Sequence, residues 1–259
     1  MFENFPQFSL PDYVKGAILG AIVIPFILAG IRRFIRYWKN TRPAMKLLEG
    51  LTKNDERCVF WLRDAYQKPG SGLLEVSEAG AGVVPNVNKW WAEVDAKAVA
   101  DVLNVLGSQG KSKNIEFHLL SQNRFDWDAN LICIGAQFPQ ANLIFDNCKN
   151  VFFKIDNDDI FDVQKASAIQ RDINYGYGII IKARNPYKTS GEGTVFLIGG
   201  FGALGTESAG YYFRNNFVKL GKRFGKNCFG VLVRAKTTAG PQSVERMFEY
   251  DRVEVKVKK

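Results

Sequence analysis

The 259-residue sequence predicts an α/β fold, in which a mainly parallel sheet is flanked by helices, carries an antiparallel edge strand and follows one N-terminal transmembrane helix. Three observations lead to this prediction. Residues 16–31 form an uncharged apolar run that ends at a cluster of arginines. Short unbroken apolar runs then alternate with segments of helical periodicity, as in sheets covered on both faces. Near the C-terminus, valines alternate with charged residues, which is typical of a half-exposed edge strand.

The run from Gly16 to Ile31 contains sixteen residues without a charge. Six cations and no acid follow within fifteen residues: Arg32, Arg33, Arg36, Lys39, Arg42 and Lys46. An apolar run with cations at one end is typical of a membrane helix whose basic end faces the cytoplasm and the anionic inner leaflet of a lipid bilayer. We therefore expect an extracytoplasmic tail over 1–14, a transmembrane helix over 15–31, a basic juxtamembrane helix over 32–56 and a cytosolic domain over 57–259.

Other interpretations of this run stay open. A cleavable signal peptide has cations before its apolar run, whereas Glu3 and Asp12 precede this one. A buried helix normally shows one polar face. A segment lying in the membrane interface fits the aromatic residues among the cations, and sixteen residues span only about 24 Å of a hydrocarbon core of about 30 Å. Gly16 and Gly20 have the spacing that lets two membrane helices pack closely, so we expect a homo-oligomer.

Composition limits the function classes. The net charge of +9 is concentrated in the basic segment, so nucleic acid is not an expected partner. The four cysteines are far apart and three lie in strongly apolar stretches, as reduced core cysteines do. The single histidine, His118, lies in a strand-like run. We therefore expect neither a metal site nor a Ser/His/Asp triad.

The expected elements of the domain follow from the pattern of apolar residues and from the glycines and prolines that interrupt it. Residues 58–66 read as a strand, 68–88 as a long connection rich in glycine and proline, and 94–106 as a helix. The remaining elements are a strand over 115–121, a strand over 130–135 with a helix after it, a strand over 151–155, an acidic surface excursion over 156–174, strands over 178–182 and 194–198, a helix from about Thr206, and strands over 229–234 and 252–258.

A glycine-rich loop lies between the strand over 194–198 and the helix after it. Gly200, Gly202 and Gly205 have the GxGxxG spacing there, which resembles the Rossmann-type dinucleotide-binding fingerprint in pattern and context. The resemblance implies that Gly200 permits a tight turn, Gly202 lets a pyrophosphate approach the backbone, and Gly205 lets helix and strand pack closely. We expect Thr206 to cap the helix and to offer its hydroxyl to a phosphate at the helix N-terminus.

The loop departs from the fingerprint in its surroundings. It lies about fifty residues from the end of the chain, and no acid ends the next strand. Arg234 ends that strand instead, and a base at this place favours a 2′-phosphate, so the resemblance implies NADP or another phosphate-rich nucleotide as the ligand. Glu207 places an anion beside the expected phosphate. A glycine turn that only packs a helix against the sheet is the structural alternative.

A second candidate loop runs from Gly135 to Asn142, again after a buried strand. Gly135 would start the turn, and Asn142 would hydrogen-bond a base, a ribose or the neighbouring loop. Ligands of open α/β sheets collect at the carboxyl ends of the strands, so the two loops build one crevice if their strands are neighbours. Here too the structural alternative is a turn in which asparagine satisfies the backbone.

These features together predict a membrane-anchored sensor or effector that binds a nucleotide or another phosphorylated ligand. Its layout is similar to that of small membrane-anchored effectors of bacterial antiviral signalling, although no motif names a family. Two alternatives stay open. One is an NADP-linked reductase or a nucleotide hydrolase, for which the sequence assigns no catalytic residue. The other is a scaffolding protein that binds no small ligand.

Overall fold

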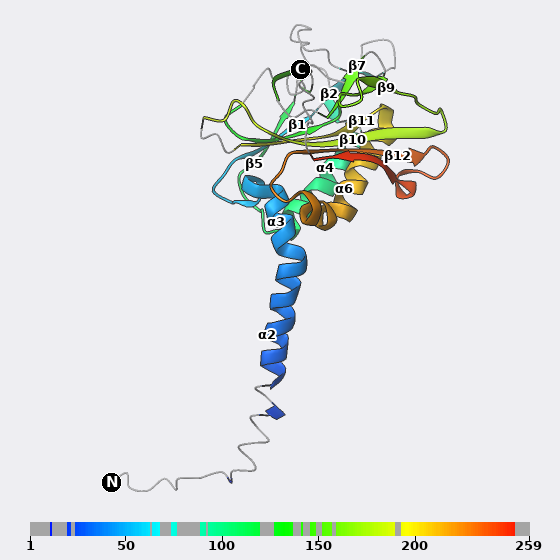
Figure 1. Ribbon diagram of the computed structural model, residues 1–259. Coiled ribbons are helices and arrows are strands. Elements are labelled where there is room, and N and C mark those ends of the chain that lie inside the picture. The colour runs from blue at the N-terminus through cyan, green and yellow to red at the C-terminus, as the bar shows by residue number, and fades with distance from the viewer. Residues whose placement is uncertain are drawn as a thin grey trace, which may run out of the picture. The chain divides into compact units, whose positions relative to one another are not determined.

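The computed structural model describes residues 11, 20–21, 24–62, 64–67, 74–76, 89–91, 93–119, 127–136, 141, 146–148, 152–156, 159–189 and 193–251. The chain divides into two compact units, Met1–Pro43 and Ala44–Lys259 (Figure 1). The first unit contains helix α2 (Ile24–Arg36) and the π-helical turn η2 (Tyr37–Thr41), and α2 has no buried residue. The second unit contains every residue of the two hydrophobic cores.

The predicted transmembrane helix is wrong. No helix within the described residues is both long enough and apolar enough to cross a bilayer. The helix found here has thirteen residues, and its last turns carry Arg32, Arg33 and Arg36. Residues 12–19 and 22–23 of the predicted tail and span lie outside the described residues. The single-pass localisation is corrected with the span, and the likeness to membrane-anchored antiviral effectors loses its support.

A seven-stranded mixed sheet organises the second unit, with the strand order β13-β12-β10-β11-β6-β1-β5. The strands are β1 (Cys58–Leu62), β5 (Ile115–Leu119), β6 (Asn130–Ile134), β10 (Tyr175–Arg184), β11 (Thr194–Gly200), β12 (Phe229–Lys236) and β13 (Glu245–Tyr250). The pairs β1–β5, β1–β6 and β6–β11 are parallel. The pairs β10–β11, β10–β12 and β12–β13 are antiparallel. Five strands therefore point one way, and β10 and β13 point the other way.

The predicted α/β class is confirmed, but the antiparallel part of the sheet is larger than one edge strand. β10 lies between β11 and β12 and is buried over most of its ten residues, so its sequence looks like that of a parallel core strand. The helix that follows the glycine loop therefore joins two strands separated by an antiparallel one. The Rossmann-like expectation holds only to the level of an α/β fold with a mixed sheet.

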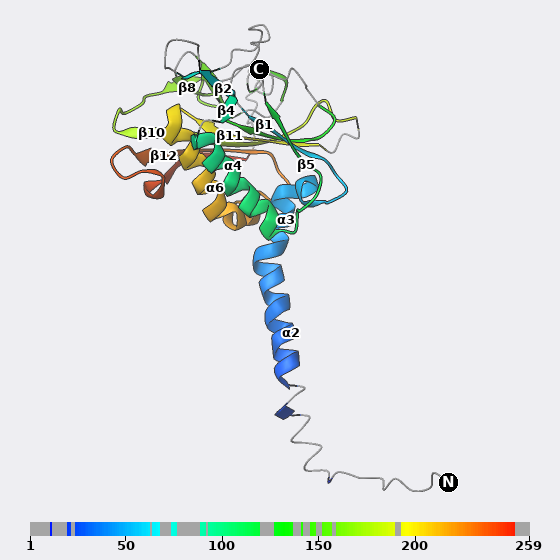
Figure 2. The same ribbon diagram turned by 180° about the vertical axis from the view of Figure 1, so that it is seen from behind.

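Helices cover one face of the sheet. α3 (Arg42–Leu48), α4 (Glu93–Ser108) and α6 (Gly202–Phe224) contribute to a core with alternate residues of the strands, such as Ile180. The other alternate residues, such as Ile179 and Ile181, point into a second core on the opposite face. Figures 1 and 2 show α4 and α6 side by side on the same face of the sheet.

Two small sheets accompany the central one. β7 (Phe153–Asp156), β8 (Asp159–Asp162) and β9 (Ser167–Ile169) form one of them. β7 overlaps the strand predicted over 151–155, whereas β8 and β9 lie within the segment predicted as an acidic surface excursion. Phe153, Ile160 and Ile169 of this sheet belong to the second core. β2 (Asp64–Gln67), β3 (Leu74–Val76) and β4 (Lys89–Trp91) form the other sheet. The expected final strand over 252–258 lies outside the described residues, and β13 and β5 are the edge strands of the described seven-stranded sheet.

Candidate functional site

The two predicted loops follow neighbouring parallel strands, β6 and β11. The Gly135 N–H donates to the Ile198 carbonyl oxygen at 2.9 Å, and the φ angle of Gly135 is 91°. A Cβ atom on Gly199 would lie 2.4 Å from the Gly135 carbonyl carbon, so the backbones of the two loops touch. The expected juxtaposition is therefore present at Gly135, whereas Asn142 lies outside the described residues.

The glycines of the loop between β11 and α6 have roles that differ from those expected. A Cβ atom on Gly200 would lie 2.3 Å from the Tyr177 carbonyl oxygen, and one on Gly205 would lie 2.2 Å from the same atom. Both residues therefore let α6 approach β10 closely, as expected for Gly205. The left-handed turn falls at Gly202, whose φ is 59° and whose missing Cβ would meet nothing within 4 Å.

The N-terminus of α6 is uncapped. Phe201 occupies the N-cap position, and no side-chain hydrogen bond caps the helix there. The Phe201 N–H donates to the Tyr177 carbonyl oxygen at 2.8 Å, and the Gly205 N–H donates to the Phe201 carbonyl oxygen at 3.3 Å. Between them, the N–H groups of Gly202, Ala203 and Leu204 find no acceptor among the described residues. Such groups carry the partial positive charge of a helix N-terminus.

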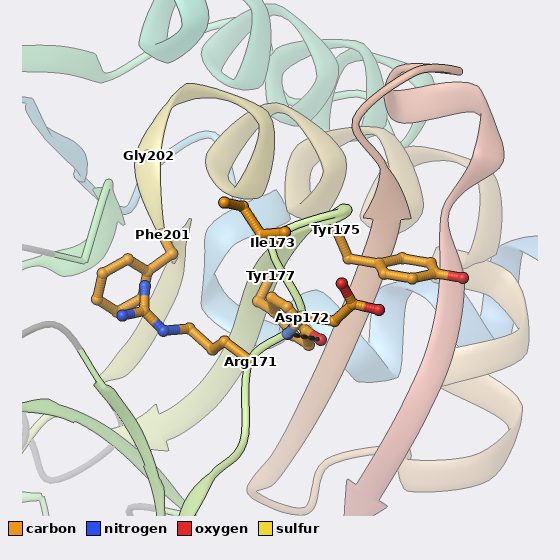
Figure 3. A pocket seen from close by; sticks show the side chains of 7 residues that line it. All are labelled: Arg171, Asp172, Ile173, Tyr175, Tyr177, Phe201 and Gly202. Carbon is orange, nitrogen blue, oxygen red and sulfur yellow. Dashed lines mark hydrogen bonds between the residues drawn. The ribbon is translucent and has the colours of Figure 1, made fainter.

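A pocket of about 440 Å³ opens beside this helix end (Figure 3). It is lined by Arg171, Asp172, Ile173, Tyr175, Tyr177, Phe201 and Gly202. The Tyr177 hydroxyl accepts a hydrogen bond from the Asp172 N–H at 2.9 Å, which ties the segment before β10 to the strand. The Asp172 carboxylate accepts hydrogen bonds at 2.9 Å from the backbone and side-chain N–H groups of Asn174. The one carboxylate among the lining residues is therefore engaged in its own turn.

Arg171 supplies a positive charge to one wall. Its guanidinium carbon lies 3.9 Å from the centre of the Phe201 ring, and Figure 3 shows the two side chains lying against each other. The Arg171 Nε atom is 3.6 Å from an Asp159 carboxylate oxygen. The stacking on Phe201 holds the cation beside the first residues of α6.

Thr206 does not cap the helix, because α6 begins four residues earlier, at Gly202. Position 206 shares a helix face with Gly210, and a Cβ atom on Gly210 would lie 2.9 Å from the Ala98 Cα atom of α4. Thr206 therefore faces α4 and is buried. Its hydroxyl has no hydrogen-bond partner among the described residues.

The two charged residues predicted around the loop have protein partners. The Arg234 Nε donates to a Glu245 carboxylate oxygen at 2.7 Å, which raises the pKa of Arg234, and its guanidinium stacks 4.5 Å from the centre of the Tyr175 ring. Arg234 thus contacts Tyr175, which lines the pocket, but is not itself a lining residue. Glu207 lies 3.4 Å from the Lys97 Nζ, so a cation offsets the anion that the sequence places near the expected phosphate.

The segment that forms the pocket together with the glycine loop was not predicted from the sequence. Arg171 precedes β10, Tyr175 and Tyr177 are at its start, and only the pairing of β10 with β11 brings this segment to Phe201. A signal was present in the alternation Tyr175-Gly176-Tyr177-Gly178. In a strand this alternation puts glycines on one face, where α6 lies, and tyrosines on the other.

Metal and thiol chemistry have little support in the described part of the chain. It contains no group of three or more histidine, cysteine or acidic side chains able to hold a metal ion. Cys58, Cys133 and Cys148 are buried free thiols, and Cys228 is half-buried. Burial raises the pKa of Cys58 and of Cys148 to about 12, so these two thiols stay protonated.

Comparison with known proteins gives no relative: no protein-family model, no curated protein and no solved structure matches the chain.

Proposed function

We propose that the pocket at the start of α6 binds a small ligand through a phosphate group. The observation that carries the proposal is a row of three N–H groups, at Gly202, Ala203 and Leu204, that find no acceptor among the described residues and lie beside a cavity with Arg171 on its wall. Free N–H groups and the helix dipole favour an anion at this place. Gly202 has no side chain to obstruct the approach of such an anion.

The other walls favour a ligand with a planar ring. Phe201 and Tyr175 bring aromatic surface to the pocket, and the Tyr177 hydroxyl lies between them (Figure 3). A volume of about 440 Å³ falls in the range of about 300–1,000 Å³ that small-molecule sites occupy. A phosphorylated compound with one planar ring, such as a mononucleotide, combines these features.

Thermal unfolding of the full chain tests the proposal. We expect pyrophosphate, AMP, ATP and NADP to raise the melting temperature to different extents. The compounds that contain a planar ring should raise it more than pyrophosphate does. A ligand at one hundred times its Kd should add about 2.7 kcal/mol to the free energy of unfolding. A melting temperature that none of the four compounds changes would contradict the proposal.

A matched pair of variants at Ala203 separates the helix end from the rest of the pocket. Ala203 is exposed, so glutamate and glutamine fit there equally well. Ala203→Glu should stabilise the free protein by about 0.5 kcal/mol through the helix dipole, yet it should weaken the phosphate ligand by like-charge repulsion. Ala203→Gln should leave ligand binding close to that of the parent chain. Equal binding by the two variants would place the ligand elsewhere.

Chromatography of the ligand after incubation distinguishes binding from catalysis. The proposal expects the compound to be recovered unchanged, because the one carboxylate among the pocket residues, Asp172, is hydrogen-bonded to Asn174. Conversion of NADP or ATP would instead support the reductase or hydrolase alternative.

A further inference from the structure

Helix α2 has two faces of opposite character. Large apolar residues recur three or four positions apart and share one face: Ile24, Ile27, Leu28, Ile31, Phe34 and Ile35. Each of these side chains is between 44% and 60% exposed, and no residue of α2 is buried. A contiguous apolar stripe of this size on a helix without a buried residue marks an interaction surface.

The other face is basic. Arg32, Arg33 and Arg36 share it with Ala29, again by spacings of three and four. Phe26, which is 74% exposed, is three residues before Ala29 and seven before Arg33, so it lies at the border of this face. Residues 32–43 contain five cations and no acid. None of these cations forms an ion pair with a described residue. Aromatic side chains follow at the end of the helix. The ring centres of Phe34 and Trp38 are 5.9 Å apart, and the Arg42 guanidinium carbon lies 3.8 Å from the centre of the Trp38 ring.

We infer that α2 lies along a lipid surface that carries anionic headgroups, with its apolar face among the acyl chains and its arginines at the phosphates. An amphipathic helix with basic residues opposite an apolar face, and with aromatic residues near its end, has the chemistry of such a surface helix. The helix lies in the interface plane and does not cross the bilayer.

Charge decides between this partner and a second copy of the chain. Two copies of α2 would cover each other's apolar faces, but their basic faces lie opposite and would point outward without an anionic partner. A nucleic acid would satisfy the cations and leave the apolar face uncovered. An anionic lipid surface satisfies both faces at once.

Vesicle co-sedimentation of the full chain tests this inference. The probes are phosphatidylcholine vesicles with and without phosphatidylserine, each at low and high salt. We expect binding only to the anionic vesicles and its release at high salt, because salt screens exposed charges. Equal binding to neutral vesicles, binding that high salt does not release, or no binding at all would overturn the inference.

Two sets of variants assign the binding to the faces of α2. Leu28→Gln on the apolar face should weaken vesicle partition about tenfold or more, whereas Ala29→Gln on the arginine face should leave it nearly unchanged. Removing two charges with Arg33→Gln and Arg36→Gln should weaken it about thirtyfold, at about fivefold per charge. Similar effects of Leu28→Gln and Ala29→Gln would overturn the proposal.

Sedimentation velocity without vesicles tests whether the apolar face of α2 binds a second copy of the chain. Self-association that Leu28→Gln abolishes, together with an absence of vesicle binding by the parent chain, would assign the apolar face to a second copy instead. A monomer that binds anionic vesicles supports the lipid surface.

Discussion

Glu56 joins several segments at the amino-terminal edge of the central sheet. Its carboxylate accepts hydrogen bonds from Lys188 at 2.8 Å, Lys53 at 2.7 Å and Asn130 at 2.9 Å. Burial alone would raise the pKa of Glu56, but these three hydrogen bonds outweigh it and lower the pKa from 4.5 to about 2. A folded state that holds the proton less tightly than the unfolded state is stabilised by ionisation of this carboxyl.

The first prediction is a loss of stability in acid that depends on Glu56. Because its folded pKa is depressed, its contribution is complete above about pH 4.5 and is lost as the pH falls through about 2. Glu56→Gln should cost about 2 kcal/mol at neutral pH and flatten this part of the stability profile, since it leaves the largely buried Lys188 without its anion. Urea unfolding between pH 2 and 7 measures both effects.

Glu116 provides the control for this prediction. Its pKa is also lowered to about 2, chiefly by hydrogen bonding to Arg57, but its side chain is 37% exposed. Because solvent screens an exposed pair, Glu116→Gln should cost clearly less than Glu56→Gln. Equal costs would mean that burial does not determine how much these ion pairs contribute to the free energy of unfolding.

The second prediction separates two glycines of the loop before α6. Gly205→Ala places a Cβ atom against the Tyr177 carbonyl oxygen, so it should cost about 3 kcal/mol or displace the helix. Gly202→Ala meets no atom but keeps a φ of 59°, which should cost about 1 kcal/mol. Chemical denaturation of the two variants gives the ranking, and a larger cost at Gly202 would contradict the assigned roles.

At the scale of elements, α4 and α6 touch where a small residue permits it. A Cβ atom on Gly210 would lie 3.0 Å from the Ala98 Cβ atom. One helical turn along from Gly210, the Arg214 guanidinium meets the Asp101 carboxylate at 2.6 Å. The crossing therefore combines a close backbone approach with an ion pair on the same side.

The third prediction is a coupling between these two positions. Gly210→Ala should destabilise the protein by about 1–2 kcal/mol because two well-packed helices must separate. Ala98→Gly removes the opposing methyl group and should recover part of this loss in the double variant. A double-mutant cycle by urea unfolding measures the coupling, and strictly additive costs would show that the two residues do not meet.

Elements with a strong local pattern were predictable, and those defined by pairing were not. Residues 94–106 have helical periodicity and lie within α4, and the apolar runs at 58–62 and 130–134 are strands. β10 is buried on both faces, so its residues contain no sign of its antiparallel direction. The pocket depends on that direction, because it brings Tyr175 and Tyr177 to Phe201. The glycine loop was therefore found from sequence, and its partner segment was not.

The N-terminal error has a different origin. Counting uncharged residues from Gly16 to Ile31 ignored how the next residues continue the same helix. In the structure one helix includes both Ile24–Ile31 and the arginines at 32, 33 and 36, and it has an apolar face and a basic face. The two faces could be predicted from the periodicity across the end of the apolar run, but not from the length of that run.

At the scale of the whole molecule, the hydrophobic cores and the proposed lipid-binding helix belong to different units. All members of both hydrophobic cores lie at or beyond Leu47, in the unit that spans Ala44–Lys259. The apolar face of α2 belongs to the unit that spans Met1–Pro43, and no residue of that helix is buried. Folding free energy comes mainly from apolar surface removed from water, so the second unit should supply nearly all of it.

The fourth prediction is that deleting residues 1–43 separates the proposed activities. The shortened chain should unfold within about 1 kcal/mol of the full chain, because it keeps every core residue. It should keep the ligand-induced stabilisation assigned to the α6 pocket and lose binding to anionic vesicles. Calorimetry with and without the phosphorylated ligand, together with co-sedimentation, measures all three properties. Vesicle binding that survives the deletion would move the lipid contact to the second unit, and a lost ligand response would show that the pocket depends on the first.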